Sequence, residues 1–356
     1  MKITLIAGAR ANFMKIAPII RAILQAQLQG RNIQYRLVHT GQHYDEKLSQ
    51  VFFKELEIPE PDVNLGVGSG SQAEQTARIM VTFERDLAEN PVDLVIVVGD
   101  VNSTMACAIV AKKMNTRVAH VEGGIRSFDL TMPEEINRMV TDAIADYFFT
   151  TSEVANKNLI QAGIEPSRIF YVGNTMIDTL IHNQHRLRCP RIWSQFNLKE
   201  KSYFLLTLHR PSNVDDPEKL LSILTHLSNH AKDYRIIFPA HPRTQHVLRN
   251  QNWKSDAINL IEPMSYLEFN FLVKHAAGVI TDSGGVQEET TFLHIPCLTL
   301  RSNTERPETE TIGTNRLIGD NMDLLKSSLT EIMNGNWRYG DVPPLWDGKT
   351  SVRIID

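Results

Sequence analysis

The sequence predicts an α/β protein that contains two doubly wound domains, and three observations lead to this prediction. Short apolar runs alternate with longer amphipathic stretches along the whole chain. The apolar runs are nearly continuous, which is typical of parallel strands that helices cover on both faces. The length of 356 residues is more than one typical domain needs.

The predicted strands form two series. We expect the first series at 3–7, 35–39, 94–98, 117–121 and 147–150, and the second at 203–208, 235–239, 278–281 and 295–300. Helical patterns between them include 17–27, 103–113 and 136–145. The two series are separated within 172–202, where the chain is polar and irregular in pattern. The sequence therefore predicts an N-terminal domain over 1–171 and a C-terminal domain over 172–339.

The amino-acid composition excludes several classes of function. Hydrophobic residues make up 42% and charged residues 22% of the chain, as in an ordinary globular protein. The formal net charge of −4 argues against sequence-independent binding to nucleic acid, which needs a basic excess. No apolar run reaches the roughly 18 residues of a membrane helix, and the start MKITLIAGAR fits a buried strand better than a signal peptide. We expect a cytoplasmic protein without a nucleic-acid or membrane partner.

Cysteines and possible metal ligands are sparse. Cys107, Cys189 and Cys297 are an odd set, which indicates free thiols in a reducing compartment. The chain has no CxxC pair, no HExxH motif and no cluster with metal-ligand spacing. No metal site is expected.

The turn after the first strand is a candidate anion site, because doubly wound sheets bind ligands beyond the carboxyl ends of their strands. Gly8 begins a turn that leads into a helix, and Arg10 and Lys15 add positive charge that suits a phosphate. The same residues could also be an ordinary loop glycine with surface cations. The turn lacks the GxGxxG spacing and the chain has no P-loop motif, so no dinucleotide cofactor is expected.

Three acidic residues follow strands or begin a helix in the first series. They are Asp100, Glu122 and Glu134. Asp100 alone could be a helix N-cap, and Glu134 could simply stabilise a helix N-terminus behind Pro133. Because the carboxyl ends of parallel strands meet at one edge, we expect the three carboxylates to converge on a single cleft.

The second series ends in residues that suit an anionic nucleotide. His209 and Arg210 follow a strand, which favours an anion contact. Ser283, Gly284 and Gly285 begin a helix whose free amides can bind phosphate, and Glu289 is one turn further, placed to accept hydrogen bonds from ribose hydroxyls. Further cationic candidates are His241, Arg243, Arg301 and Arg306, of which the first two fit an ordinary surface loop equally well.

The two domains are therefore expected to divide the chemistry. The second would hold a nucleotide diphosphate, and the first would present carboxylates to the same cleft. Carboxylates that move a proton beside a phosphate leaving group suggest elimination or glycosyl chemistry.

Six motifs along the chain together resemble the non-hydrolysing UDP-N-acetylglucosamine 2-epimerases. They are HVEGGIRS, PEEINR, GNTMID, TDSGGVQEE, TERPE and GTNRLIG, and the resemblance covers essentially the whole chain, in order. The resemblance implies two Rossmann-like domains in a glycosyltransferase-B-like fold, with the active site in the interdomain cleft. It also implies that a C-terminal segment of about 340–356 packs back on the first domain, and that the protein is a homodimer.

The resemblance further implies a reaction without a cofactor. The family interconverts UDP-N-acetylglucosamine and UDP-N-acetylmannosamine, substrates of surface polysaccharide synthesis in bacteria and archaea. Anti elimination of UDP gives 2-acetamidoglucal, and re-addition of UDP leaves C2 inverted. This route fits a C2–H bond that has no ring carbonyl beside it to acidify it.

Residue roles follow from the matching motifs. Asp100, Glu122 and Glu134 would be the carboxylates that move the C2 proton, and His209 would lie at the diphosphate. The UDP-sugar would be held by Arg10, Lys15, Arg138, Phe269, Ser283, Gly284, Gly285, Glu289 and Arg306. Phe269 would lie against uracil, Glu289 would hold the ribose and Arg306 the phosphates.

Departures from the family pattern leave more than one activity open. They are Arg10-Ala11-Asn12, Met264 and Gln42-His43-Tyr44, where many members have Arg-Pro-Glu, Gln and Gln-His-Arg. Such departures fit a 2-epimerase of a related UDP-2-acetamido sugar, either a 2,3-diacetamido uronate or a 2,6-dideoxy sugar. A glycosyltransferase of the same fold, a hydrolysing epimerase and an inactive nucleotide-sugar sensor are three rival functions. The three carboxylates favour epimerisation.

Overall fold

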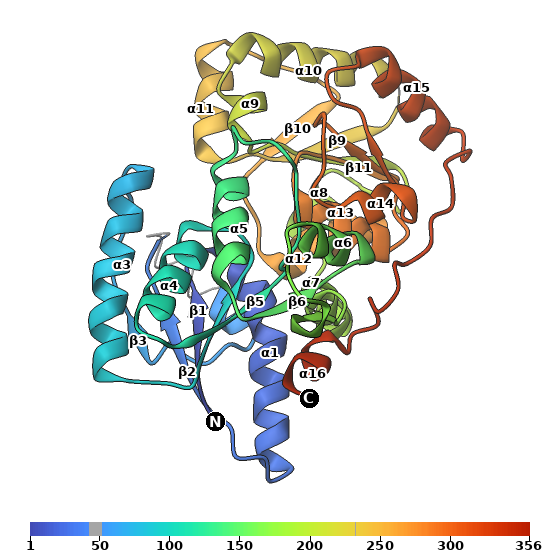
Figure 1. Cartoon of the computed structure of the whole chain (residues 1–356). Coiled ribbons are helices and arrows are strands. Elements are labelled where there is room, and N and C mark those ends of the chain that lie inside the picture. The colour runs from blue at the N-terminus through green and yellow to red at the C-terminus, as the bar shows by residue number, and fades with distance from the viewer. Residues whose placement is uncertain (43–51, 232) are drawn as a thin grey trace. The chain divides into compact units, whose positions relative to one another are not determined.

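The computed structural model describes residues 1–42, 52–231 and 233–356. These residues divide into two compact units, one of Met1–His182 with Pro344–Asp356 and one of Asn183–Pro343. Each unit contains one sheet with helices packed around it (Figure 1). Every strand pairing in these sheets is parallel. The predicted α/β class is confirmed.

The sheet of the first unit has seven strands in the order β3-β2-β1-β4-β5-β6-β7. The strands are β1 (Lys2–Ala7), β2 (Gln34–His39), β3 (Val63–Asn64), β4 (Leu94–Val98), β5 (Arg117–Val121), β6 (Tyr147–Thr150) and β7 (Ile169–Tyr171). The chain winds outward in one direction to β3 and in the other from β4 to β7. The order therefore reverses between β1 and β4, the point where doubly wound sheets bind ligands.

The sheet of the second unit repeats this plan with six strands in the order β10-β9-β8-β11-β12-β13. The strands are β8 (Tyr203–Thr207), β9 (Arg235–Pro239), β10 (Ile258–Ile261), β11 (Gly278–Thr281), β12 (Cys297–Thr299) and β13 (Asn315–Leu317). Its order reverses between β8 and β11. Tyr203 and Leu205 pack into one apolar cluster and Phe204 and Leu206 into another, so helices cover both faces of this sheet.

The helices follow the strands in alternation. Those of the first unit are α1 (Arg10–Leu28), α3 (Gln72–Glu89), α4 (Asn102–Lys113), α5 (Pro133–Ile144), α6 (Glu153–Gln161), α7 (Thr175–Asn183) and α16 (Thr350–Ile355). Those of the second are α8 (Arg191–Gln195), α9 (Pro211–Val214), α10 (Pro217–His230), α11 (Pro242–Asn250), α12 (Tyr266–His275), α13 (Gly284–Phe292), α14 (Pro307–Thr311) and α15 (Met322–Met333). In the first unit α3, α4 and α5 pack side by side, and α1 packs against α16 (Figure 1).

All nine predicted strands are present, with ends shifted by a few residues at most. The sequence missed four strands, β3, β7, β10 and β13, and these are the edge strands of the two sheets. Edge strands are covered less completely, and most residues of these four are partly exposed. They are also short, so they lack the continuous apolar run by which the central strands were recognised.

The first unit ends at His182, later than the predicted boundary at 171, because α7 is tied to the C-terminal segment. Asp178 on α7 accepts hydrogen bonds from the amides of Thr350 and Ser351, at 3.1 and 2.7 Å, and from the Ser351 hydroxyl at 2.7 Å. Trp346 donates from its indole nitrogen to the Thr151 carbonyl at 3.2 Å. The segment Pro344–Asp356 thus completes the first unit.

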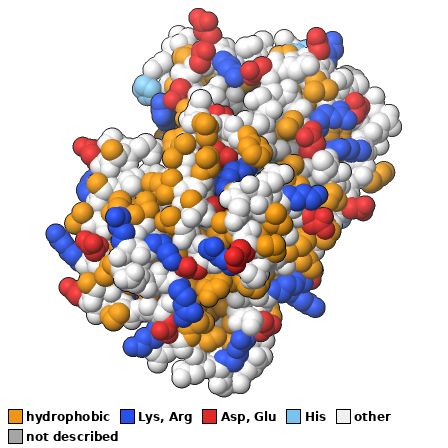
Figure 2. All heavy atoms as spheres, in the orientation of Figure 1, with side chains coloured by type: hydrophobic (Ala, Val, Ile, Leu, Met, Phe, Trp, Pro, Cys, Tyr) orange, Lys and Arg blue, Asp and Glu red, His pale blue; other side chains and the backbone are white. Residues whose placement is uncertain are grey.

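Charge and hydropathy over the described part of the chain agree with the composition. On the face shown in Figure 2, Lys and Arg side chains are interspersed with Asp and Glu. None of the helices within 1–42, 52–231 and 233–356 is both long and apolar enough to span a membrane.

Candidate functional site

The turn between β1 and α1 is locked to the end of β4 by Asn12. The Asn12 side chain is buried, accepts hydrogen bonds from the amides of Gly8 and Ala9 at 3.0 and 2.9 Å, and donates to the Val98 carbonyl at 2.9 Å. A Cβ atom at Gly8 would lie 2.1 Å from the Ser103 hydroxyl, so only glycine fits there. Asn12, one of the departures from the family pattern, thereby sets the geometry of the switch point. Arg10 is the first residue of α1.

Lys15 and Glu122 form a buried ion pair next to this turn. The Lys15 ammonium lies 2.6 Å from Glu122 Oε2, and both side chains are almost fully buried. Glu122 follows β5 with a φ of +71°, a left-handed conformation that costs a non-glycine residue about 1–3 kcal/mol. Gly99, which follows β4, has a φ of +67° and lies against the Lys15 side chain. A strained carboxylate held by a buried cation is typical of a functional site.

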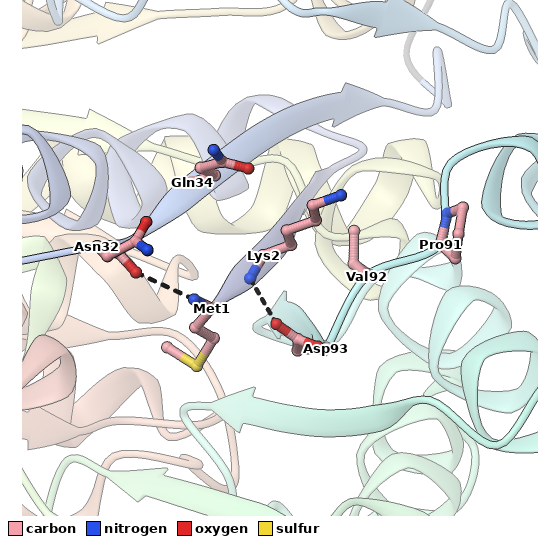
Figure 3. Close-up of a pocket in the computed structure, with 7 residues that line it drawn as sticks. All are labelled: Met1, Lys2, Asn32, Gln34, Pro91, Val92 and Asp93. Atoms are coloured by element: carbon pink, nitrogen blue, oxygen red, sulfur yellow. Dashed lines mark hydrogen bonds between the residues drawn. The ribbon is translucent and has the colours of Figure 1, made fainter.

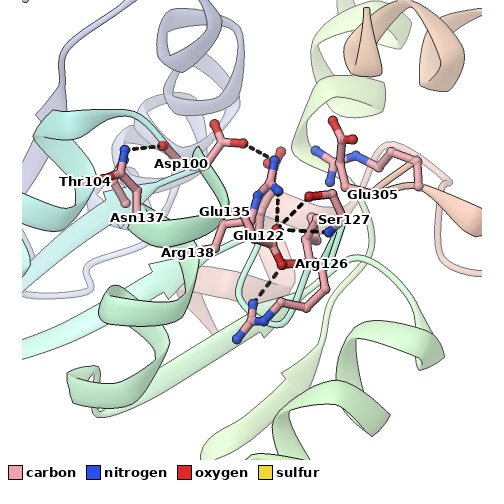
Figure 4. A network of polar contacts seen from close by, with 12 residues as sticks. Asp100, Thr104, Glu122, Arg126, Ser127, Glu135, Asn137, Arg138 and Glu305 are labelled. Atoms are coloured by element: carbon pink, nitrogen blue, oxygen red, sulfur yellow. Dashed lines mark hydrogen bonds and ion pairs between the residues drawn. The ribbon is translucent and has the colours of Figure 1, made fainter. Parts of the chain in front are cut away.

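Arg138 links Asp100 to Glu135 (Figure 4). Its guanidinium donates to Asp100 Oδ2 at 2.5 Å and to Glu135 Oε2 at 2.7 Å. Glu135 is buried and also accepts from the Ser127 amide and hydroxyl at 2.9 and 3.0 Å. The Asp100 side chain keeps 27% of its surface exposed. Asp100 is thus a half-exposed carboxylate on a buried cation.

Glu134 precedes Glu135 in the first turn of α5 and is half-buried. Pro133 begins this helix, and the acidic pair at its start is favourable for the helix dipole. The sequence picked Glu134 as the third carboxylate, and the structure places the adjacent Glu135 in the buried contact with Arg138.

A buried histidine, His120, belongs to a network beside the turns that carry Asp100 and Glu122. His120 Nδ1 lies 2.7 Å from Asp142 Oδ1, and its Nε2 lies 2.8 Å from the Gly99 carbonyl oxygen. Asp142 Oδ2 accepts from the Gly124 amide at 3.0 Å and pairs with Arg126 at 2.6 Å. Burial alone would raise the pKa of Asp142, but His120 and then Arg126 outweigh burial and lower it. This network connects the turn that carries Asp100 to the turn that carries Glu122.

In the second unit the start of α13 presents backbone amides. Ser283 is its N-cap, with Gly284 and Gly285 in the first turn. A Cβ atom at Gly284 would lie 2.6 Å from Glu305 Oε1, so glycine at this position allows the Glu305 carboxylate to approach the turn closely. Amides that have no intrahelical acceptor, at the positive end of a helix dipole, form a site for a phosphate.

Asp282 holds the loop that follows β8. It is fully buried and accepts hydrogen bonds from the amides of His209 and Arg210 and from the Asn213 side chain, at 3.0 to 3.2 Å. His209 Nδ1 lies 2.7 Å from Asp282 Oδ1, and the His209 side chain is 58% exposed. Burial alone would raise the pKa of Asp282, but His209, the Arg210 amide and Asn213 lower it.

Glu289 on α13 is a buried carboxylate with neutral neighbours. Asn270 donates to its Oε1 at 3.3 Å, and Tyr266 also contacts it. Burial raises the pKa of Glu289 to about 7, and these two hydrogen bonds offset the rise only in part. Phe269, next to Asn270 on α12, is partly buried and packs against the apolar cluster on its side of the sheet.

Arg306, the N-cap of α14, lies against Glu288 of α13. Its Nε is 2.5 Å from Glu288 Oε1, and both side chains are buried. Arg301 donates to Glu305 at 2.6 Å. Both arginines that follow β12 are therefore held by carboxylates.

Several polar residues of these networks are absent from the sequence-based set of site residues, among them His120, Glu135, Asp142 and Asp282. His120 carries a signal that could have been noticed, because it is a polar residue within the buried part of the strand RVAHV. Asp282 directly precedes Ser283 and could have been read as part of the same turn. Of the family departures, His43 and Tyr44 lie outside the described residues.

One pocket lies at the opposite edge of the first sheet. It surrounds the amino ends of β1, β2 and β4 (Figure 3) and is lined by Met1, Lys2, Asn32, Gln34, Pro91, Val92 and Asp93. Parallel sheets bind ligands at the carboxyl ends of their strands, so this pocket does not belong to the candidate site. Within the described residues, no group of three or more His, Cys, Asp and Glu side chains is arranged to hold a metal ion.

Comparisons with known proteins find relatives over the whole chain. The family model described as UDP-N-acetylglucosamine 2-epimerase matches residues 26–356. The UDP-N-acetylglucosamine 2-epimerase of Methanocaldococcus jannaschii is 43% identical, over 100% of this chain and 98% of that protein. The UDP-2,3-diacetamido-2,3-dideoxy-D-glucuronate 2-epimerase of Pseudomonas aeruginosa is 38% identical, over 100% of this chain and 99% of that protein.

Two solved structures share the fold. The Methanocaldococcus jannaschii enzyme in complex with UDP-GlcNAc and UDP matches with a TM-score of 0.88, covering 100% of this chain and 98% of that one. The Neisseria meningitidis UDP-GlcNAc 2-epimerase bound to UDP-GlcNAc is 28% identical and matches with a TM-score of 0.87, covering 100% and 98%.

Proposed function

This chain belongs to the UDP-N-acetylglucosamine 2-epimerase family, and from that premise we propose that it interconverts UDP-N-acetylglucosamine and UDP-N-acetylmannosamine. The observation that carries the proposal is the 43% identity over the full length to a UDP-N-acetylglucosamine 2-epimerase. The strand-end carboxylates of the first unit and the phosphate-binding turn of the second supply the groups that this reaction needs.

The proposed reaction begins with removal of the C2 proton by a carboxylate of the first unit. The C2–H electron pair forms a C1–C2 double bond, and the C1–O bond breaks with its electrons moving to the β-phosphate oxygen of UDP. Re-addition of UDP after the proton returns to the other face of C2 gives the epimer. A general base contributes about 10²–10⁴-fold to such a step.

Asp100 and Glu122 support this step through their surroundings. Each lies just after a central strand, β4 or β5, and is paired with a buried cation, Arg138 or Lys15. In each pair the cation holds the carboxylate in a fixed position after its strand. Glu134 is assigned to the same proton transfers by its place in the PEEINR motif.

The leaving group is assigned to the second unit. The amides at Ser283–Gly285, His209 and Arg306 would bind the diphosphate, and Glu289 and Phe269 the uridine. Donors that strengthen as UDP becomes more anionic stabilise the transition state specifically, and loss of one such donor typically costs about 3–4 kcal/mol. In the first unit, Arg10 and Arg138 would complete the contacts to the sugar phosphate and the reacting ring.

We further propose that the protein acts in the cytoplasm as a homodimer. The three cysteines are free thiols, two of them buried, which fits a reducing compartment. Sedimentation analysis of the purified chain tests the dimer, and a monomer at micromolar concentration would contradict it.

Isotope exchange tests the activity. Incubation with UDP-N-acetylglucosamine in D₂O should place deuterium at C2 and produce UDP-N-acetylmannosamine, both visible by NMR. The UDP-2,3-diacetamido uronate should be run in parallel because a relative that is 38% identical is named for it. Exchange with the uronate alone would reassign the substrate, and exchange with neither would overturn the proposal.

A further inference from the structure

We propose that Asp282 is a positioning residue for the reaction: it fixes the ring of His209 so that Nε2 faces the diphosphate of UDP and donates to it as the C1–O bond breaks. This inference rests on the proposed function and deepens it. Asp282 would not touch the substrate. It would act through the orientation and tautomer of His209.

The contacts of Asp282 all come from the loop that carries His209. Its buried carboxylate accepts from the His209 and Arg210 amides, from Asn213 and from the His209 ring. The Asp282 carbonyl also accepts from Arg210 Nε at 3.0 Å. One side chain at the end of β11 therefore fixes the loop after the neighbouring strand β8, at the point where the strand order reverses.

Hydrogen-bond chemistry then decides the state of the ring. Three other donors surround the Asp282 carboxylate, and its lowered pKa keeps it an acceptor only. His209 Nδ1, at 2.7 Å, must therefore carry a hydrogen. A neutral ring is then the Nδ1–H tautomer with a lone pair on Nε2, and a protonated ring is a donor at Nε2 with a counter-charge behind it.

The exposure of the His209 ring and the position of Asp282 next to the start of α13 indicate that Nε2 of His209 faces an anion. The His209 side chain is 58% exposed, and Nε2 lies on the side of the ring away from Asp282. Asp282 immediately precedes Ser283, the N-cap of α13. The turn that orients the ring therefore also begins the helix whose first amides suit a phosphate.

The proton balance of the step is simple. As C1–O breaks, the bond electrons pass to the β-phosphate oxygen, and the Nε2 proton moves to that phosphate, leaving neutral His209 as the Nδ1–H tautomer. On the return, the phosphate gives the proton back to Nε2 while its oxygen attacks C1. Asp282 remains a carboxylate throughout.

A double-mutant cycle tests this role. Asp282→Asn is nearly isosteric, but it has one acceptor oxygen for four donors, and its amide hydrogens favour the other tautomer of His209. We expect kcat to fall about 10²–10⁴-fold, in the range of a general acid, with the Kd for UDP changed less than about threefold. His209→Ala should cause a similar loss, and the double variant should be no worse than His209→Ala. Additive losses would show that Asp282 acts independently of His209 and would overturn the proposal.

A second readout does not depend on turnover. Nitrogen-15 NMR of histidine-labelled full-length protein, with His209→Gln to assign the signal, should show a hydrogen on His209 Nδ1 in wild type, in the neutral and in the protonated ring alike, and its loss from the neutral ring in Asp282→Asn. Asp178→Asn is the matched control, because Asp178 is also a buried acceptor of backbone amides. It should leave the His209 signal and kcat unchanged.

The experiments distinguish a failure of the proposed activity from a failure of the positioning role of Asp282. If wild type exchanges no deuterium with either UDP-sugar, the proposed function fails while the NMR result still reports on Asp282. If wild type exchanges deuterium but Asp282→Asn retains full kcat or the wild-type tautomer, the positioning role is wrong and the activity stands.

Discussion

Two histidine–aspartate pairs with the same separation have opposite surroundings. His120 lies 2.7 Å from Asp142 in the first unit, and His209 lies 2.7 Å from Asp282 in the second. Both carboxylates are buried and both have a lowered pKa, against the effect of burial, because of the histidine beside them. The His120 side chain is fully buried, whereas the His209 side chain is 58% exposed.

The second ring nitrogen makes the difference. In His120 it is bonded to the Gly99 carbonyl at 2.8 Å, so the ring bridges two fixed acceptors. In His209 it lies on the exposed side of the ring. A histidine–aspartate pair is therefore structural when protein groups satisfy both ring nitrogens, and it is available for chemistry when one nitrogen faces outward.

The largest effect should come from Asp100 and Glu122, the carboxylates on the two turns that the His120–Asp142 network connects. Glu122→Gln keeps the shape of the side chain but cannot take a proton, so kcat should fall about 10²–10⁴-fold with little change in UDP affinity. Asp100→Asn should behave in the same way. Steady-state rates together with calorimetric UDP binding measure both quantities. Normal turnover in both variants would show that these carboxylates only balance Lys15 and Arg138.

The next largest effect should be the loss of stability when the fully buried pair of His120 and Asp142 is broken. Asp142→Asn leaves His120 and Arg126 without their buried counter-charge and should lower the free energy of unfolding by about 3–5 kcal/mol. Asp282→Asn should cost less, since water can solvate the exposed His209 ring. Urea titrations of both variants measure the difference. Equal losses would mean that exposure does not separate the two pairs.

Glu289 is a buried carboxylate with neutral neighbours, and it should make the stability of the protein depend on pH. Burial raises the pKa of Glu289 from its ordinary value of 4.5 to about 7, so the folded state retains a proton that the unfolded state loses between these values. Stability therefore falls as the pH rises through this window, by about 3 kcal/mol when the titration is complete. Glu289→Gln has no proton to lose, and it should match wild type near pH 4.5 and exceed its Tm at pH 8. A Tm difference that is the same at both values would contradict the buried charge.

The same variant has an effect on the nucleotide. An amide accepts a hydrogen bond from a hydroxyl more weakly than a carboxylate does, so UDP affinity at pH 8 should fall although the protein is more stable. Unchanged affinity would separate Glu289 from the ribose.

The smallest effect should come from a third ion pair at the same distance. Arg31 Nη1 lies 2.7 Å from Asp356, but the two side chains are 39% and 68% exposed. Arg31→Ala should change the free energy of unfolding by less than about 1 kcal/mol, because water screens an exposed pair. A loss comparable to that of Asp142→Asn would show that distance matters more than burial.

The central strands could be predicted from the sequence, and the edge strands could not. Runs such as LVIVV at Leu94–Val98 are buried on both faces, and burial leaves a continuous apolar pattern. Val63–Asn64 and Asn315–Leu317 pair on one side only and have no such pattern. The order of the strands was not predicted, because it depends on contacts between distant segments.

The candidate site shows the same division. Asp100, Glu122 and His209 could be singled out because each follows an apolar run, and the structure places them at the carboxyl ends of β4, β5 and β8. Their partners could not be found in this way. Asp282 is 73 residues from His209, and Asp142 is 22 from His120, so these pairs exist only once the sheet is assembled.

The return of the chain to the first unit sets an order of events during synthesis. The ribosome releases Asp178 long before Thr350 and Ser351, which donate to its buried carboxylate. The whole of Asn183–Pro343 is made in the interval and has a complete sheet of its own. The unit that is translated first is therefore the one that is finished last, and until then a nascent chain exposes the surface of α1 that the final helix will cover.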